Sequence, residues 1–202
     1  MEQLLKAGNG MVKHALWVLA LGALIGYASV YFAGASAGPF DAASINTGDT
    51  AWVLIAAALV MLMTPAVGFF YGGMVSAKNV VSVLKQSLII LARVSVQWVV
   101  LGYSLVFGTD VGGVIGNLNF FGLRGVGFAP DANYAGTIPA LVFMIFQGMF
   151  AIITPALIIG AFVERIRFST LVIFTLLWTT LVYDPVAHSV WGVGGWLRDL
   201  GA

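Results

Sequence analysis

Long apolar runs separated by polar segments are the dominant pattern of this chain. Past its first fifty residues, the pattern predicts helices at about 51–71, 86–107, 138–163 and 168–190. Each run is near the twenty residues that an α-helix needs to cross the roughly 30 Å hydrocarbon core of a bilayer. The sequence therefore predicts an all-α, polytopic transmembrane helical bundle in contact with lipid.

The third run carries the most informative pattern, and residues 138–163 contain no charged side chain. Phe143, Phe146 and Phe150 recur at a spacing that places three rings on one helical face. Pro155 interrupts the backbone hydrogen bonds midway. Two interpretations stay open: a kinked membrane helix whose rings pack on its neighbours, or a helix that lines a path and presents ring faces to a passing guest.

The first thirty-seven residues have a separate character. Lys6 and Lys13 precede an uncharged run over residues 15–32, and the small-residue segment AGASAG follows at 33–38. This pattern is typical of a secretory signal peptide, here cleaved after about Ala37, but the apolar run is long enough for an extra amino-terminal transmembrane helix. Either interpretation makes residues 38–50 an extracytoplasmic linker.

The basic residues predict the orientation. With the amino terminus inside, six of them face the cytoplasm and two face outward, namely Lys6, Lys13, Lys78, Lys85, Arg165 and Arg167 against Arg124 and Arg198. This asymmetry agrees with the positive-inside rule. Arg93 is the exception, because it lies about eight residues past Lys85 within the second run. It either reaches back to the cytoplasmic interface along its long stem or has a functional partner.

Composition narrows the class further. The 202 residues are 60% hydrophobic and only 8% charged, against about 25% charged in soluble domains. The net charge of +1 gives no case for nucleic-acid binding, and the absence of cysteine removes thiolate chemistry. We find no paired carboxylates, nucleophile–base pair or metal-ligand spacing in the apolar runs, so we expect no enzyme, no metal site and no cofactor.

Aromatic residues gather near the predicted outer surface. Pro185 is expected to break the fourth helix, so that residues 187–195 turn across the mouth and bring Trp191 over Phe146 and Phe150. A vestibule of ring faces without a fixed positive charge would attract a small, weakly hydrated cation. From the residues alone, a cation or an amphipathic substrate is as far as this inference goes.

Four segments together resemble the ammonium transporter/Rhesus family, and specifically its ammonium-transporter branch. The resemblance runs from about Thr50 to the end of the chain, in the family's order and spacing. Its segments are GFFYGGMVSAKNVVSVLKQS (68–87), WVVLGYSLVFG (98–108), FQGMFAIITPALIIGAFVERIRF (146–168) and YDPVAHSVWG (183–192).

The resemblance implies a homotrimer in a cell (inner) membrane, each subunit having eleven helices in two inverted five-helix repeats around its own pore. It implies an outer ammonium site in which Phe146, Phe150 and Trp191 match the family's two phenylalanines and tryptophan. The ring that matches Phe150 also gates the pore. Ammonium then loses its proton and crosses as ammonia. The family also has a cytoplasmic trimeric nitrogen-regulatory signal protein as partner.

The resemblance leaves other parts unmatched. The chain carries four of the eleven helices, less than one repeat, so we expect a fragment that does not conduct alone. The family's pore histidines belong to later helices, and we interpret His188 and Asp184 as structural. Arg93 stands where a small or apolar residue is expected. An ammonium sensor, a Rhesus-type neutral gas channel and a non-conducting truncated membrane protein remain the alternatives.

Overall fold

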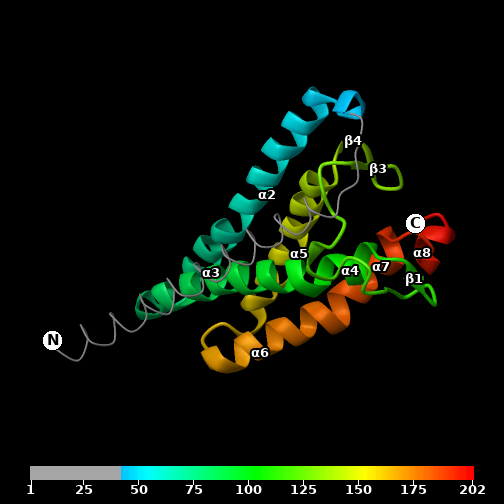
Figure 1. Cartoon of the computed structure of the whole chain (residues 1–202). Coiled ribbons are helices and arrows are strands. Elements are labelled where there is room, and N and C mark those ends of the chain that lie inside the picture. Colours follow the sequence, from blue (N-terminus) through cyan, green and yellow to red (C-terminus); the bar gives the residue numbers. More distant parts are fainter. Residues whose placement is uncertain (1–41) are drawn as a thin grey trace.

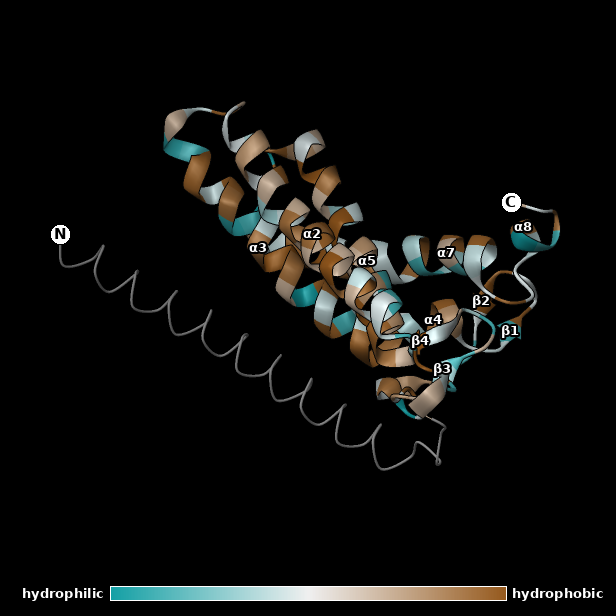
Figure 2. Ribbon diagram, turned by 90° about the horizontal axis from the view of Figure 1, so that it is seen from above, coloured by the Kyte–Doolittle hydropathy of each residue, from teal (hydrophilic) through white to brown (hydrophobic). Residues whose placement is uncertain are grey.

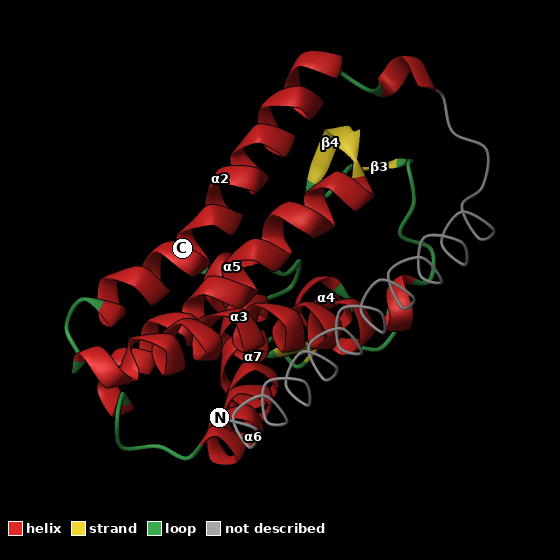
Figure 3. Cartoon of the chain, turned by 90° about the vertical axis from the view of Figure 1, so that its left-hand side faces the viewer, coloured by secondary structure: helices red, strands yellow, loops and turns green. Residues whose placement is uncertain are grey.

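The computed structural model describes residues 42–202, and the signal peptide or extra helix predicted for residues 1–37 lies outside them. The described chain is mainly helical (Figure 3). Its helical segments are η1 (Ala42–Ser44), α2 (Thr47–Gly72), η2 (Ala77–Asn79), α3 (Val80–Gln97), η3 (Trp98–Gly102), α4 (Tyr103–Phe107), η4 (Phe121–Leu123), α5 (Ala140–Phe162), α6 (Phe168–Trp178), η5 (Thr179–Tyr183), α7 (Asp184–Trp191) and α8 (Trp196–Asp199).

Four continuous helical stretches are long and apolar enough to cross a membrane, and the predicted all-α transmembrane bundle is confirmed. They cover Thr47–Gly72, Ala77–Phe107, Ala140–Phe162 and Phe168–Asp199. Hydrophobic positions dominate α2 and α5, whereas hydrophilic positions gather around β1 and α8 (Figure 2). Helices α2, α3 and α5 pack against one another, and α6 packs on α3 (Figure 1).

Two of the predicted boundaries were wrong. Helix α2 begins at Thr47, inside the predicted linker, because Asn46 caps it by accepting a 3.0 Å hydrogen bond from the Asp49 N–H. Helix α3 begins at Val80, six residues earlier than predicted, so Lys85 belongs to the helix. A lysine near a helix end can extend its long stem toward the interface, so it does not mark the start of the span.

The predicted break at Pro185 was also wrong, because the fourth helical stretch continues through it to Trp191. The preceding turn, η5, is a π-helix in which the Asp184 N–H donates to the Thr179 carbonyl five residues earlier. A wider turn directly before a proline relieves the clash between its ring and the preceding carbonyls. Trp191 is therefore carried by a helix, and the chain leaves the helical conformation only at Gly192.

The long connection after α4 contains two short hairpins that the apolar pattern did not predict. Strand β1 (Asp110–Val111) pairs with β2 (Ile115–Gly116), and β3 (Pro130–Asp131) pairs with β4 (Ala135–Pro139). Gly112 and Gly113 form the first turn with φ values of 71° and 77°. Two successive residues with positive φ are what a tight hairpin turn needs, which explains the glycine pair.

The segments that connect the helices of the described chain gather at two ends, here called the hairpin end and the loop end. At the hairpin end, the start of α2 meets β4 through the Asn46 N–H, which donates to the Thr137 carbonyl at 2.8 Å, and α7 meets β2. At the loop end, residues 73–79 meet residues 163–167, where Glu164 accepts hydrogen bonds from the Ser76 N–H at 3.1 Å and the Asn79 amide at 2.7 Å. Because Lys78, Arg165 and Arg167 lie at the loop end, the positive-inside rule predicts that the hairpin end is the outer one.

Candidate functional site

Helix α5 presents the Phe146 and Phe150 side chains as a contacting ring pair. Their centroids lie 5.1 Å apart with an interplanar angle of 85°, an edge-to-face arrangement. Both residues are half-buried. One turn later, the Thr154 hydroxyl donates to the Phe150 carbonyl at 2.7 Å. This bond stays within the helix, and side-chain bonds of this kind often bend a helix. It lies directly before Pro155, which has no N–H to donate to the Ala151 carbonyl.

Phe143 does not continue this pair. Its ring contacts Phe107 at 5.0 Å and stacks on Tyr134 at 5.7 Å between centroids. Tyr134 also contacts Phe107, at 4.9 Å. The three rings of α5 that were predicted on one face therefore have different contacts. Phe143 packs the loop that carries Tyr134 against the core, and Phe146 and Phe150 contact each other edge to face.

Trp191 ends α7 at the hairpin end and is 40% exposed. Its carbonyl accepts a 2.7 Å hydrogen bond from Nη1 of Arg198, which fixes the short helix α8 beside it. Trp191 lines a cavity of about 280 Å³ whose other walls are Phe107, Asn133, Tyr134, Phe143, Gln147, Val190, Arg198 and Ala202.

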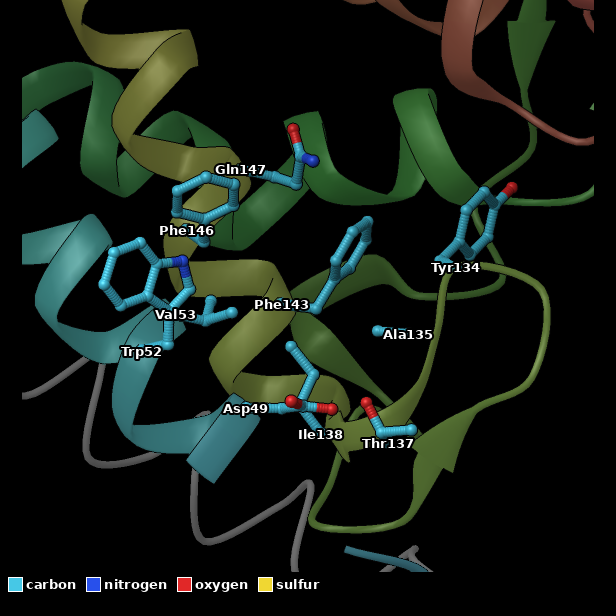
Figure 4. Close-up of a pocket in the computed structure, with 10 residues that line it drawn as sticks. All are labelled: Asp49, Trp52, Val53, Tyr134, Ala135, Thr137, Ile138, Phe143, Phe146 and Gln147. Atoms are coloured by element: carbon cyan, nitrogen blue, oxygen red, sulfur yellow. The ribbon is translucent and has the colours of Figure 1, made fainter. Parts of the chain in front are cut away.

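A second cavity, of about 350 Å³, opens between the start of α2, strand β4 and α5 (Figure 4). Phe146 lines this one, together with Asp49, Trp52, Val53, Tyr134, Ala135, Thr137, Ile138, Phe143 and Gln147. Tyr134, Phe143 and Gln147 belong to both cavities. Phe146 and Trp191 thus line adjoining cavities with a common wall, whereas Phe150 is among the lining residues of neither.

The expectation of a vestibule without a fixed positive charge was wrong. The Arg198 guanidinium lines the cavity of Trp191 and lies 5.6 Å from the centroid of the Tyr134 ring. The Tyr134 hydroxyl accepts a 2.9 Å hydrogen bond from the Val193 N–H. Burial raises the pKa of Tyr134 above its usual value, which the Val193 bond and the Arg198 charge partly offset. The ring is already in contact with the Arg198 cation and stacks on Phe143.

His188 is fully buried one turn before Trp191 and has two acceptors around its ring. Its Nδ1 lies 2.7 Å from the Val106 carbonyl, and its Nε2 lies 3.0 Å from Oδ1 of Asp110. A carbonyl can only accept, so Nδ1 carries a hydrogen and donates it to Val106. The geometry makes His188 a tether between α7 and the first hairpin.

Asp184 and Gln97 form a second buried polar contact, between the two helical stretches that contain π-helical turns. Nε2 of Gln97 donates to Oδ2 of Asp184 at 2.7 Å and to the Thr180 hydroxyl at 3.2 Å. Asp184 Oδ1 and Gln97 Oε1 have no partner among the described residues. Arg93 is half-buried one turn before Gln97, and its Nε is likewise without a partner among residues 42–202.

Sequence reasoning missed several residues that shape the outer cavities. Gln147 was noticed only as an interruption of the apolar face, and its Oε1 is a buried acceptor without a partner within residues 42–202. Asp49, Trp52 and Tyr134 had no signal beyond being polar or aromatic near a helix end. Within residues 42–202, no group of three or more His, Cys, Asp or Glu side chains is placed to hold a metal ion.

Comparison with known proteins shows the family to which this chain belongs. A family model described as the Ammonium Transporter Family matches residues 51–202. The chain belongs to this family. As a member of the Ammonium Transporter Family with four membrane-capable helical stretches, it is a multi-pass membrane protein.

Its relatives include curated proteins and solved structures. It is 51% identical over 158 residues to the ammonium transporter of Bacillus subtilis and 50% identical over 158 residues to a putative ammonium transporter of Methanothermobacter thermautotrophicus. The crystal structure of Candida albicans Mep2 matches with a TM-score of 0.71 at 36% identity, covering 78% of this chain. A protein described as a sensor Amt protein matches with a TM-score of 0.68 at 25% identity, over 75% of this chain.

The chain spans a minor part of these relatives. The match covers 78% of this chain but 38% of the Bacillus subtilis transporter and also 38% of the Methanothermobacter protein. For Candida albicans Mep2 the covered share of the larger chain is 34%. The helices described above therefore correspond to one part of a larger transporter architecture.

Proposed function

We propose that this protein takes part in moving ammonium across a membrane, with Phe146, Phe150 and Trp191 forming its outer recruitment site. The observation that carries the proposal is the adjoining pair of cavities, one lined by Phe146 and the other by Trp191. The Phe146–Phe150 ring contact extends this arrangement along α5 toward the membrane interior. Membership of the Ammonium Transporter Family supplies the substrate.

The physical logic fits a small cation that can lose a proton. Ring faces attract ammonium by their quadrupoles, an attraction worth about 0.5–2 kcal/mol depending on desolvation, and strongest for tryptophan. An intact ion entering an apolar passage would lose its hydration at a much larger cost. Ammonium can shed a proton near the outer site and continue as ammonia, whereas potassium cannot. Phe150, the deeper ring of the pair, acts as the gate of this passage.

Assembly and regulation form the second part of the proposal. The whole protein is a homotrimer, and a cytoplasmic nitrogen-regulatory signal protein binds at the loop end. The contact between Glu164 and the Ser76–Asn79 segment supports this placement, because it joins the two loops that carry Lys78 and Arg165. This role is transport with a reversible proton transfer, in which ammonium gives up a proton on entry and ammonia regains one on the other side, and the cargo is not converted into another product.

Uptake of methylammonium tests the function. The natural gene is expressed whole in cells that lack their own ammonium transporters, and uptake of labelled methylammonium is measured against concentration. Trp191→Leu removes one ring face, so we expect the apparent KM to rise about 2- to 30-fold. Phe150→Ala removes the gate, so we expect potassium to compete with methylammonium. Phe128→Leu is the control, because Phe128 is an exposed ring of the hairpin end outside both cavities.

Unchanged uptake in Trp191→Leu and Phe150→Ala would remove these residues from the site. A natural gene product that moves no methylammonium would contradict the transport function itself. In that case the similarity to the sensor Amt protein favours ammonium sensing on the same scaffold. Electrical recording separates a third possibility, since a neutral gas channel of the Rhesus type carries ammonia without current.

A further inference from the structure

The cavity between α2 and α5 combines features that attract a cation. Asp49 contributes a carboxylate, and the Trp52 and Phe146 rings contribute aromatic faces. Figure 4 shows these two rings on one side of the cavity, Phe143 in its middle and Asp49 below them. We propose that this cavity is the entrance of the outer site, an antechamber in which Asp49 and Trp52 hold a hydrated ammonium or alkylammonium ion beside Phe146 before it reaches Phe150. This inference rests on the proposed transport function.

The geometry of α2 brings the charge and the ring to one place. Asp49 and Trp52 are three residues apart, so they lie on the same face of the first helical turns. Trp52 is 75% exposed, and its ring borders the cavity instead of filling the core. Asp49 is exposed and lines the cavity. A cation that arrives from solvent therefore meets this carboxylate at the cavity.

The start of α2 is held rigidly against the other wall. The Asn46 N–H donates to the Thr137 carbonyl at 2.8 Å, and the Asn46 side chain caps the Asp49 N–H at 3.0 Å. Thr137 belongs to β4, which leads directly into α5 and its Phe146. These bonds fix the position of Asp49 relative to Phe146, and a preformed arrangement loses less entropy when a ligand binds.

Gln147 connects this antechamber to the cavity of Trp191. Its Oε1 is buried and has no partner within residues 42–202, and the residue lines both cavities. A buried carbonyl oxygen without a donor is unfavourable, so it is a ready acceptor for an N–H donor that passes between the cavities. An ammonium ion has such donors on every side.

The dimensions set the form of the ligand. The cavity measures about 350 Å³, which lies in the range of pockets for small organic molecules and exceeds what one bare ammonium ion fills. An ion that enters with part of its water, or an alkylammonium ion, suits the space. Charge and ring faces then concentrate the cation at the mouth, and removal of its water follows deeper, at the ring pair.

Kinetics of methylammonium uptake by the whole natural gene product test the antechamber. Asp49→Asn should raise the apparent KM about three- to tenfold and leave kcat unchanged, since the charge acts before the passage. The increase should shrink at high ionic strength, because salt screens an exposed charge. Asp199→Asn is the matched control: it removes one exposed carboxylate from the same end of the protein, outside both cavities, and its KM should equal that of the parent.

Trp52 supplies a second comparison that does not depend on the charge or on folding of the Asp49 variant. Trp52→Phe retains a ring and should stay within about twofold of the parent in KM, whereas Trp52→Leu should raise KM about two- to fivefold. If Trp52 only anchors α2 at the membrane interface, both variants change the amount of protein in the membrane and leave KM unchanged.

The outcomes separate the two levels of the proposal. Equal KM values for Asp49→Asn and Asp199→Asn, with normal uptake by the parent, overturn the antechamber and leave the transport function intact. A parent that takes up no methylammonium overturns the proposed function instead. A salt-dependent rise in KM confined to Asp49→Asn, with the leucine variant of Trp52 weaker than the phenylalanine variant, establishes the site.

Discussion

The buried His188 forms hydrogen bonds with groups that lie far from it in the sequence. His188 contacts the Val106 carbonyl and Asp110, which precede it by 82 and 78 residues. From the sequence, His188 is interpreted as structural, because the pore histidines of the family that the chain resembles belong to later helices. Its partners could not be predicted, because no local spacing records which loop returns to a helix end.

Arg198 illustrates the same limit for charge. Its position near the end of the chain marked it as an outward-facing basic residue, but its place over the Tyr134 ring and beside the Trp191 carbonyl depends on the fold of α8. These two contacts hold the guanidinium in place. Its positive charge therefore lies at the wall of the Trp191 cavity, where the sequence predicted no fixed positive charge. By contrast, the Phe146 and Phe150 spacing was enough to place two rings together, because both belong to one helix.

Gly148 yields a prediction about helix packing at the residue scale. A Cβ at this position would lie 2.8 Å from Cδ1 and 2.9 Å from Nε1 of Trp98. The Trp98 ring cannot move aside freely, because its Nε1 donates to the Met144 carbonyl at 3.1 Å. We expect Gly148→Ala to destabilise the protein by about 1–3 kcal/mol, the usual cost of overpacking.

Thermal unfolding in detergent measures this effect. Gly136→Ala is the matched control, because a Cβ there meets no heavy atom within 4 Å. An unfolding temperature for Gly148→Ala equal to that of Gly136→Ala would show that the contact between α3 and α5 is looser than the distances indicate.

At the scale of elements, the two π-helical turns explain why helix existence could be predicted but helix shape could not. Turn η3 covers Trp98–Gly102 and turn η5 covers Thr179–Tyr183, and the two segments contact each other. The hydrogen bonds from Gln97 to Asp184 and Thr180 lie at this crossing. A single inserted residue does not alter the apolar content of a run, so periodicity continues to predict an unbroken helix. The wrong prediction at Pro185 was the opposite one: a break was expected there, because the sequence does not show the π-helical turn that lets the helix continue through the proline.

Glu164 supports a prediction about the two inner loops. Its hydrogen bonds, first from the Asn79 side chain and then from the Ser76 N–H, lower the pKa of the carboxyl below its usual range. A carboxylate with a depressed pKa contributes stability above the pKa of the unfolded chain and loses it as pH falls through the lowered value. We expect the loop contact to be complete at neutral pH and to open only in acid below the ordinary pKa of glutamate.

Hydrogen exchange at the Ser76 amide reports on this contact. Exchange should be slow at neutral pH and faster in Glu164→Ala at every pH. Glu164→Gln, which keeps an acceptor without the charge, should show intermediate protection and no acid-dependent loss. If the alanine variant exchanges like the parent, the two loops are held together by other contacts.

For the whole molecule, apolar run length predicted the number and order of the membrane-capable helical stretches, and their orientation stays a prediction from the positions of the basic residues. The hairpins of residues 110–139 were not predicted, since strands of two to five residues carry too little pattern to detect. Yet these hairpins close the hairpin end, and Tyr134 in the second hairpin borders both outer cavities. The site thus depends on a helix pattern that could be predicted and on loop geometry that could not.

Membrane orientation is the prediction that joins these levels, because the aromatic cavities can recruit ammonium from outside only if the hairpin end faces outward. Residues 1–202 contain no cysteine, so a single introduced thiol in this part reports its own side. Ala132 lies between the strands of the second hairpin, and Ala77 lies between α2 and α3; both are exposed.

In intact cells that express the whole natural gene, a membrane-impermeant maleimide should label Ala132→Cys and spare Ala77→Cys, while permeabilised cells should label both. The parent protein, without an introduced cysteine, shows how much label is bound by any thiol outside residues 1–202. The opposite labelling would place the loop end and its basic residues outside, against the positive-inside rule, and the rings of Trp191 and Phe146 would then face the cytoplasm.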